Sequence, residues 1–395
     1  MSLPDNRPKS VQIFTSAEAW LIIGAVLALY MANAHHALYE MLAHGHLHFS
    51  YEEFGWSIEK SIHWIAVDVL MAFFFFVVGA ELKIDFTDKE QGAFKKRSDV
   101  IAPLVGALGG VAFPAAICAV LAADYAAQAF GVPMATDIAF TLAIAKMMGL
   151  SRPEMAFLKA LAVIDDVFGV MVIALFYGEG FDLATWSAAG IGVMLILFVG
   201  YGLKWQSKGW YLIGMAVLWW LFYRAGIHPT LAGVAAGFAA PHVTGDMHST
   251  AHRIGHVFNQ WMQPWILFCF AFVSCGIYGV ELVGGDLNYG VMAGIGLGLF
   301  IGKPLGIWST LWALRAMFNV EPDFDYRRIP TIGALAGFGF TVALFVNGLA
   351  FPEDATLLLS GKIGIFAGSI ASVLLAVVLN ATSKKHRDVA AHTTA

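Results

Sequence analysis

The chain has 395 residues, of which 59% are hydrophobic and only 13% are charged, and its formal net charge is −5. Soluble proteins carry about twice that share of charged residues. The chain has no basic tract for nucleic acid, and its three cysteines, Cys118, Cys269 and Cys275, fall inside apolar runs without disulfide or metal-ligand spacing. Composition therefore excludes a soluble enzyme, a secreted disulfide scaffold and a nucleic-acid-binding protein, and it predicts a membrane protein.

Apolar segments long enough to cross a bilayer recur along the whole chain. A membrane-spanning helix needs roughly 20 apolar residues. In chain order, twelve candidate segments lie at 18–34, 61–82, 100–122, 131–149, 155–177, 184–202, 209–224, 228–241, 258–277, 289–312, 329–350 and 357–380. The eighth, HPTLAGVAAGFAAP, is short and rich in small residues, so a tilted, buried or differently bounded helix is left open there. We therefore predict an all-α polytopic membrane protein, with one transmembrane domain over 1–395 and short tails at 1–15 and 382–395.

The lysine and arginine residues give an independent test of this span count. Of the 23, the N-terminus, the even-numbered loops and the C-terminus hold 18, when residues at span ends are counted with the adjoining loop. The odd-numbered loops hold only Lys60 and Arg224, and the remaining three lie within spans. Positive residues concentrate on the cytoplasmic side of a membrane. Both termini are therefore predicted to be cytoplasmic.

Several ionisable residues fall inside the predicted spans. Such residues are expensive in a bilayer and are functional candidates by default. They are Asp68, Asp137, Lys159, Asp165, Asp166, Lys303 and Lys362, with Glu81 at a span end. For Asp68, Glu81 and Lys362, a structural ion pair or a misjudged helix end remains an open alternative.

Asp165 and Asp166 are adjacent in the middle of the fifth span, LAVIDDVFGVMVIALFY. Neighbouring helical positions differ by about 100°, so one carboxylate can face a protein partner while the other faces a water-filled cavity. Two carboxylates this close resist being ionised together and are expected to titrate as a pair.

Two spans contain residues that interrupt helices. Pro133 and Thr136 precede Asp137 in the fourth span, and Gly337 and Gly339 lie in the eleventh. A break at mid-membrane is tolerated only where it is buried in protein or lines a cavity. The run IAFT (138–141) is similar to FGFT (338–341), which lies seven spans later. Because seven is odd, the equivalent segments enter the membrane from opposite sides, so spans three to five and ten to twelve would form an inverted repeat.

Lys303 lies in the tenth span, in LGLFIGKPLGIW. An unpaired buried ammonium costs several kcal/mol or loses its proton, so Lys303 needs a carboxylate partner, and Asp165 and Asp166 are the candidates. The sequence therefore predicts one site that combines acidic residues of spans four and five with a cation from span ten.

Five sequence runs in this order resemble the NhaA family of sodium/proton antiporters. They are ATDIAF (135–140), IDDVFG (164–169), GIHPTLAG (226–233), LFIGKPLGI (299–307) and GFGFT (337–341). The resemblance covers nearly all of 15–380. It implies twelve helices, with the fourth and eleventh unwound and crossing at mid-membrane. It also implies electrogenic exchange of cytoplasmic sodium or lithium for external protons across a bacterial inner membrane, with no cofactor. A homodimer is left open.

The resemblance also implies roles for individual residues. Asp166 matches the principal cation carboxylate, and Asp165 matches the carboxylate that pairs with Lys303. Asp137 and Thr136 match residues of the unwound helix that offset opposing helix dipoles or help to bind the ion. The remaining matches are Asp68 in span two, Glu81 and His228 at positions linked to pH response, and Lys362 in the last span.

The chain departs from the family pattern at three places. Leu82, Lys83, Ile84 and Asp85 follow Glu81, where the family usually has a Lys-Arg pair, and Val167 and Phe168 precede Gly169. Lys159 falls where the family is commonly apolar or hydroxyl-bearing. It lies about two turns, or roughly 10 Å, before Asp166 on the same face. An extra cation there is expected to change how the carboxylates titrate or to compete with the ion.

Three functions are compatible with aspartates inside membrane spans. In the leading hypothesis, protons and sodium compete for the same carboxylate oxygens, and the chain has no phosphate-binding GxxxxGK[ST] motif. An intramembrane aspartyl protease would need its two aspartates on different helices. A third alternative keeps the fold but carries another monovalent cation or acts as a regulatory homologue with altered coupling.

Overall fold

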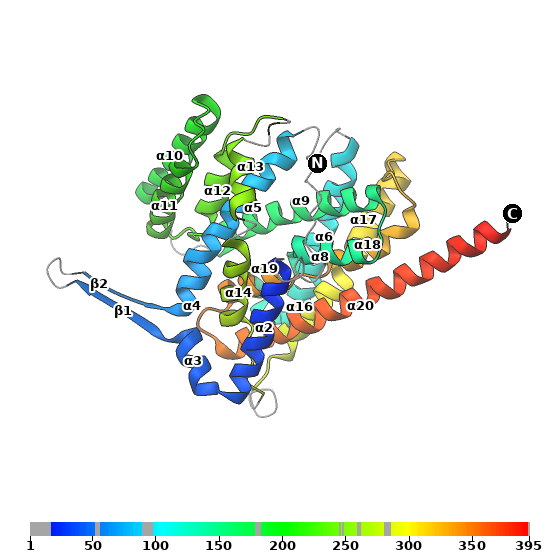
Figure 1. Cartoon of the computed structure of the whole chain (residues 1–395). Coiled ribbons are helices and arrows are strands. Elements are labelled where there is room, and N and C mark those ends of the chain that lie inside the picture. The colour runs from blue at the N-terminus through cyan, green and yellow to red at the C-terminus, as the bar shows by residue number, and fades with distance from the viewer. Residues whose placement is uncertain are drawn as a thin grey trace, which may run out of the picture. The chain divides into compact units, whose positions relative to one another are not determined.

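The computed structural model describes residues 17–51, 56–88, 98–177, 183–244, 246, 249–258, 262–279 and 286–393. They are mostly helical (Figure 1). The chain forms two compact units, each made of two separate stretches of sequence. Unit 1 comprises Met1–Gln91 and Gly178–Gly284, and unit 2 comprises Gly92–Tyr177 and Gly285–Ala395. The predicted tail at 1–15 lies outside the described residues.

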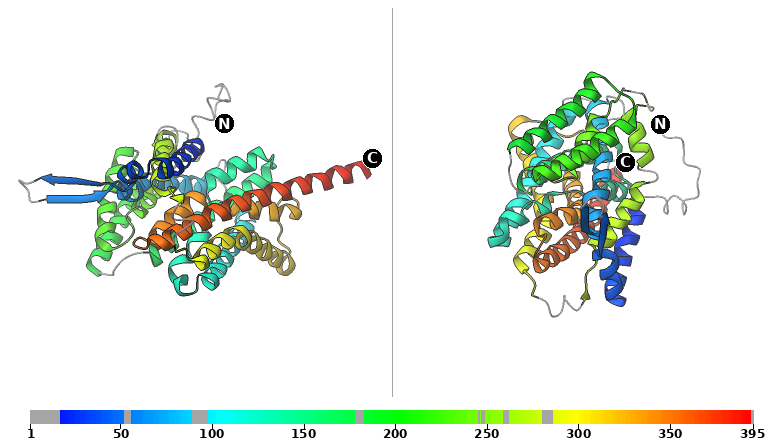
Figure 2. Two further views of the ribbon diagram at one scale, coloured as in Figure 1. Left: turned by 90° about the horizontal axis from the view of Figure 1, so that it is seen from below. Right: turned by 90° about the vertical axis from the view of Figure 1, so that its left-hand side faces the viewer.

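Unit 1 consists of helices and one β-hairpin. Its elements are α2 (Ala17–Ala34), α3 (His36–His44), β1 (His46–Tyr51), β2 (Trp56–Ser61), α4 (Ile62–Trp64), the π-helical turn η2 (Ile65–Leu70), α5 (Met71–Thr87), α10 (Leu183–Leu197), η5 (Phe198–Gly202), α11 (Lys208–Ala225), α12 (Leu231–Ala239), α13 (Thr250–Val257) and α14 (Gln263–Ser274). The two strands pair antiparallel, with His46 opposite Ser61. They project as a narrow ribbon from α3 and α4 in Figure 1 and in the left view of Figure 2.

Helices α5 and α12 pack closely because glycines remove side chains from their contact. A β-carbon on Gly233 would meet the backbone of Ala72 and Phe76, and one on Gly237 would meet the backbone of Phe76 and Ala80. Small residues four apart are typical of tightly packed membrane helices. The contacting residue numbers rise together on both helices, so α5 and α12 run parallel. The predicted order of twelve spans requires the same direction for the second and eighth spans.

Unit 2 repeats one order of elements in its two stretches of sequence. The first stretch has α6 (Ser98–Ala122), η3 (Ala123–Tyr125), α7 (Ala126–Ala129), η4 (Val132–Met134), α8 (Ile138–Met147) and α9 (Arg152–Phe176). The second has α16 (Tyr289–Leu297), η7 (Gly298–Gly302), α17 (Lys303–Phe318), η8 (Tyr326–Arg328), α18 (Ile329–Ala336), α19 (Phe340–Ala350) and α20 (Ala355–Thr393). Each stretch therefore gives long helical segments on either side of an interrupted one. The red helix α20 in Figure 1 continues through most of the predicted C-terminal tail.

The helices of the described residues support a polytopic membrane protein, but fewer than twelve meet a strict test of length and composition. Five helices are long and apolar enough to cross a membrane, and the bent pair Tyr326–Ala336 and Phe340–Ala350 gives a sixth. The eighth predicted span contains only the nine residues of α12. Helix α9 carries Lys159, Asp165 and Asp166 within its apolar stretch. The count of twelve therefore remains a prediction.

The glycine contact between α5 and α12 yields a stability prediction. We expect Gly237→Ala to destabilise the protein by about 1–3 kcal/mol, because the added methyl group overpacks the contact. Thermal unfolding in detergent measures the change. Gly190→Ala in α10 is the matched control, since nothing lies within 4 Å of a β-carbon at Gly190. Equal melting temperatures for the two variants would contradict this account of the packing.

Candidate functional site

Two interrupted helices of unit 2 meet through their backbones. The short turn η4 ends at Met134, residues on either side of Thr136 are extended, and α8 begins at Ile138. In the second segment, α18 ends at Ala336 and α19 begins at Phe340, with a bend of 49°. The backbone N–H of Asp137 donates a hydrogen bond of 2.8 Å to the carbonyl of Phe338. The interruptions are thus joined by a direct backbone contact.

Asp137 places one carboxylate between the N-termini of two helices. Its side chain caps α8 by accepting from the amide of Phe140 at 3.2 Å, and it accepts from the amide of Thr341 in the first turn of α19 at 3.3 Å. Each helix N-terminus carries a partial positive charge. The buried carboxylate compensates both partial charges and satisfies donors that have no partner within their own helices.

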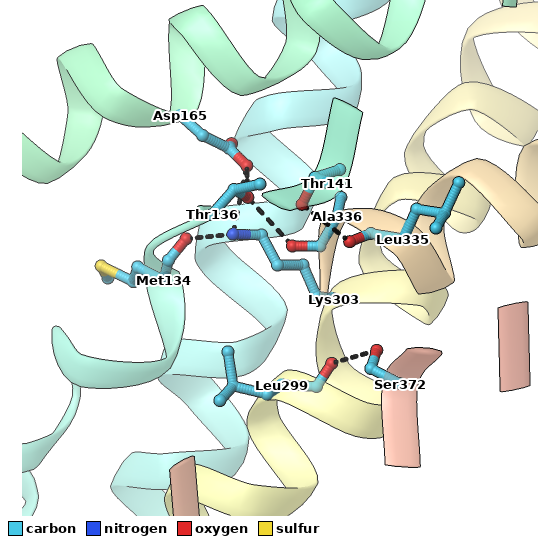
Figure 3. A network of polar contacts seen from close by, with 9 residues as sticks. All are labelled: Met134, Thr136, Thr141, Asp165, Leu299, Lys303, Leu335, Ala336 and Ser372. Carbon is cyan, nitrogen blue, oxygen red and sulfur yellow. Dashed lines mark hydrogen bonds and ion pairs between the residues drawn. The ribbon is translucent and has the colours of Figure 1, made fainter. Parts of the chain in front are cut away.

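Lys303 brings a fully buried ammonium to the other end of the first interruption, where η4 ends. Its Nζ lies 3.1 Å from Oδ2 of Asp165 and also donates to the carbonyl of Met134, where η4 ends (Figure 3). Neither side chain is exposed to solvent. A carboxylate and a carbonyl at a helical C-terminus both favour a positive charge, so they stabilise this ammonium in the apolar interior.

Thr136 links Asp165 to the second interrupted helix. Its hydroxyl lies 2.8 Å from Oδ2 of Asp165 and 3.0 Å from the carbonyl of Ala336, the last residue of α18. Figure 3 shows Thr136 between these two acceptors. A hydroxyl has one proton to donate. Thr136 therefore donates to one acceptor at a time, and its donor can pass from the carboxylate to the carbonyl.

The oxygen atoms around Lys303 suit a hard monovalent cation. They belong to the Asp165 carboxylate, the Thr136 hydroxyl and the carbonyls of Met134 and Ala336, and hard cations prefer such ligands. Among the described residues, Oδ1 of Asp165 is buried without a hydrogen-bond partner. Asp166 is half-buried on the next position of α9 and interacts electrostatically with Lys303. Both aspartates are thus electrostatic neighbours of the Lys303 ammonium.

The other predicted site residues lie elsewhere. In unit 1, Nε2 of His228 lies 3.3 Å from Oδ1 of Asp68, and its Nδ1 lies 2.7 Å from the hydroxyl of Thr230. Glu81 is exposed on α5. In unit 2, Lys159 on α9 and Lys362 on α20 are half-buried. The proposed roles of these residues remain predictions.

Two buried polar clusters were not predicted from the sequence. In unit 2, Nε of Arg328 lies 2.6 Å from Oε1 of Glu154. In unit 1, Nε2 of His242 lies 3.0 Å from Oδ2 of Asp88, and its Nδ1 lies 3.2 Å from the hydroxyl of Ser249. The same hydroxyl also contacts Nδ1 of His252. Burial and the neighbouring His242 lower the pKa of His252, so this ring is neutral at neutral pH. These residues lie at predicted span ends or in loops, where charge alone gives no signal of pairing.

The ion pair of Lys303 and Asp165 yields a second stability prediction. Lys303→Ala should destabilise the protein by about 3–5 kcal/mol, because it leaves the Asp165 carboxylate buried without its cation. The double variant Lys303→Gln with Asp165→Asn removes both charges and should recover much of that loss. Thermal unfolding decides the point: if the double variant is no more stable than Lys303→Ala, the ion pair is not what stabilises this region.

Comparison with known proteins gives a consistent family assignment. The family described as Na+/H+ antiporter 1 matches residues 9–379. An Na+/H+ antiporter NhaA of Yersinia pseudotuberculosis is 35% identical over 379 residues, which cover 92% of this chain and 94% of the relative. NhaA 3 of Streptomyces coelicolor is 34% identical over 99% of this chain and 84% of its own length, and NhaA of an Enterobacter species is 39% identical over 77% and 78%. Since the match spans nearly the whole chain, this protein belongs to the Na+/H+ antiporter 1 family of transporters.

Proposed function

We propose that the protein is an electrogenic sodium/proton antiporter of a bacterial inner membrane, which exchanges cytoplasmic Na+ or Li+ for external H+. Family membership supports the transport class and its ions. The observation that carries the mechanism is the buried contact of Lys303 with Asp165, beside Asp166 and two interrupted helices. In this mechanism, a cation and protons compete for the carboxylate oxygens of the aspartate pair.

The charges of the site explain why the two ions exclude each other. A protonated aspartate pair beside the Lys303 ammonium offers no net negative charge to a metal cation. When protons leave, two carboxylates and the nearby hydroxyl and carbonyl oxygens attract Na+. Exchange is electrogenic when more than one proton leaves per cation. Asp165, Asp166 and Lys303 are three groups that can hold those protons.

In the proposed transporter, twelve spans cross the membrane and both termini are cytoplasmic. The two stretches of unit 2 form an inverted repeat. The transporter needs no cofactor beyond the transported ions, and the homodimer is the assembly to test. The second candidate, a carrier of another monovalent cation, is favoured by the additional ammonium of Lys159 on the aspartate helix.

Neutralising the proposed cation carboxylate should abolish exchange. Asp166→Asn removes the negative charge that binds the cation, so sodium-dependent proton movement in everted vesicles should fall to background. A panel of Li+, Na+ and K+ identifies the ion in the same assay. Asp124→Asn makes the same chemical change at an exposed position of unit 2 and should transport normally. Substantial exchange by a well-inserted Asp166→Asn protein would contradict the assignment of Asp166 as the carboxylate that binds the cation.

Competition between protons and sodium also determines how the apparent KM for sodium depends on pH. The cation needs deprotonated carboxylates, so the apparent KM must rise as the pH falls through the range in which the pair titrates. Where one proton leaves per cation, the rise is about tenfold per pH unit, and it is steeper where two leave. Initial rates in proteoliposomes at several pH values, with sodium raised until saturation, measure it. A constant KM with a changing maximal rate would instead indicate a separate pH sensor near Glu81 or His228.

A further inference from the structure

A buried ion pair that lies apart from the aspartate site joins two helices of unit 2. Nε of Arg328 lies 2.6 Å from Oε1 of Glu154, and their side chains are 3% and 5% exposed. The second carboxylate oxygen of Glu154 accepts from the amide of Ser151 at 2.6 Å, which closes the capping box at the start of α9. Both oxygens of Glu154 are thus held in one orientation.

The two partners lie at the starts of helices that reach the aspartate site farther along. Glu154 precedes Asp165 by eleven residues on uninterrupted α9, so both lie within about 20° on one face and about 16 Å apart. Arg328 precedes Ala336 by eight residues, which is about 12 Å along α18. Asp165 in the middle of α9 and the carbonyl of Ala336 at the end of α18 share the hydroxyl of Thr136. Polar contacts therefore join α9 and α18 at two levels.

Between these contacts the two helices pack through apolar side chains. Leu158 and Leu161 of α9 and Ile332 and Leu335 of α18 belong to one buried cluster. Hydrophobic attraction is non-directional and depends on the area removed from water, so it resists a small sliding motion weakly. A charge-assisted hydrogen bond is short and directional. The ion pair therefore adds a directional contact that opposes axial sliding of α18 against α9, beside the hydrogen bonds that Thr141 and Ser372 donate to the carbonyls of Leu335 and Ala334.

We propose that Glu154 and Arg328 are positioning residues for the cation site. By fixing the axial register of α18 against α9, they set how far the Ala336 carbonyl and the Thr136 hydroxyl lie from the Asp165 carboxylate. The inference rests on the proposed function, because the register is expressed as affinity for the transported cation. A hard cation binds only where its oxygen ligands converge, so a sliding of α18 weakens cation binding before it affects the rate at saturation.

Kinetics of three variants test the proposal. Arg328→Gln should raise the apparent KM for sodium about fivefold or more at fixed alkaline pH, with a smaller change in maximal rate. Arg328→Lys keeps the charge and a donor, so its KM should return to within about twofold of the unmodified protein. Arg315→Gln is the matched control, since its ion pair with Glu321 in the same unit is 2.9 Å long but 47% and 46% exposed. Its KM should not change.

A loss of thermal stability in Arg328→Gln with an unchanged KM would mean that the pair is only structural, and it would overturn the proposal. If Arg328→Gln does not fold, Glu154→Gln replaces it, because the amide keeps an oxygen that accepts from Arg328. Glu154→Gln should raise the KM in the same direction, and an unchanged value would again overturn the proposal.

Hydrogen exchange separates this proposal from the proposed function. In Arg328→Gln, amides at 335–341 should exchange faster, since these residues connect α18 to Asp137, whereas amides of α20 should not. If the unmodified protein shows no sodium-dependent transport, the proposed function fails, yet faster exchange at 335–341 still supports the positioning role. Faster exchange confined to 326–330 contradicts it.

Discussion

The burial of one ammonium group constrains much of unit 2. Lys303 is wholly buried, so its charge requires acceptors brought to it by other elements. Glycines permit the approach: a β-carbon on Gly298 would lie 2.8 Å from the Pro133 side chain, and one on Gly302 would lie 2.9 Å from the Cα of Pro114. The turn η7 therefore packs directly against α6 and η4, and Lys303 begins α17 next to the carbonyl of Met134.

The helix interruptions leave backbone carbonyls and amides free to form hydrogen bonds with side chains. In a continuous helix the carbonyls of Met134 and Ala336 would accept bonds from their own turns. Here they accept from the side chains of Lys303 and Thr136, while the amides of Phe140 and Thr341 donate to Asp137. Such bonds can exchange partners without unwinding a helix. The long helices can therefore keep their structure while these hydrogen bonds change.

The sequence predicted the parts of this site that follow from simple rules and left out the parts that depend on helix rotation. A buried lysine needs a carboxylate, which limited its partner to Asp165 or Asp166. The choice of Asp165 depends on how α9 is rotated, and sequence does not fix that rotation. No sequence rule pairs Glu154 with Arg328, because both lie just outside predicted spans and 174 residues separate them. The eighth predicted span is short in the sequence, and α12 within it is shorter still, because apolar composition does not reveal where a helix ends.

The Asp165 carboxylate is engaged on one side only, and this asymmetry connects the structure to competition between ions. Its Oδ2 is near both the Lys303 ammonium and the Thr136 hydroxyl, whereas Oδ1 is buried and has no hydrogen-bond partner among the described residues. An oxygen in that state attracts any positive charge that reaches it. In the proposed mechanism, a proton and a sodium ion compete for this oxygen while Lys303 stays in place, and the binding of one excludes the other. In that mechanism Lys303 holds the carboxylate through Oδ2 and leaves Oδ1 to the competing ions.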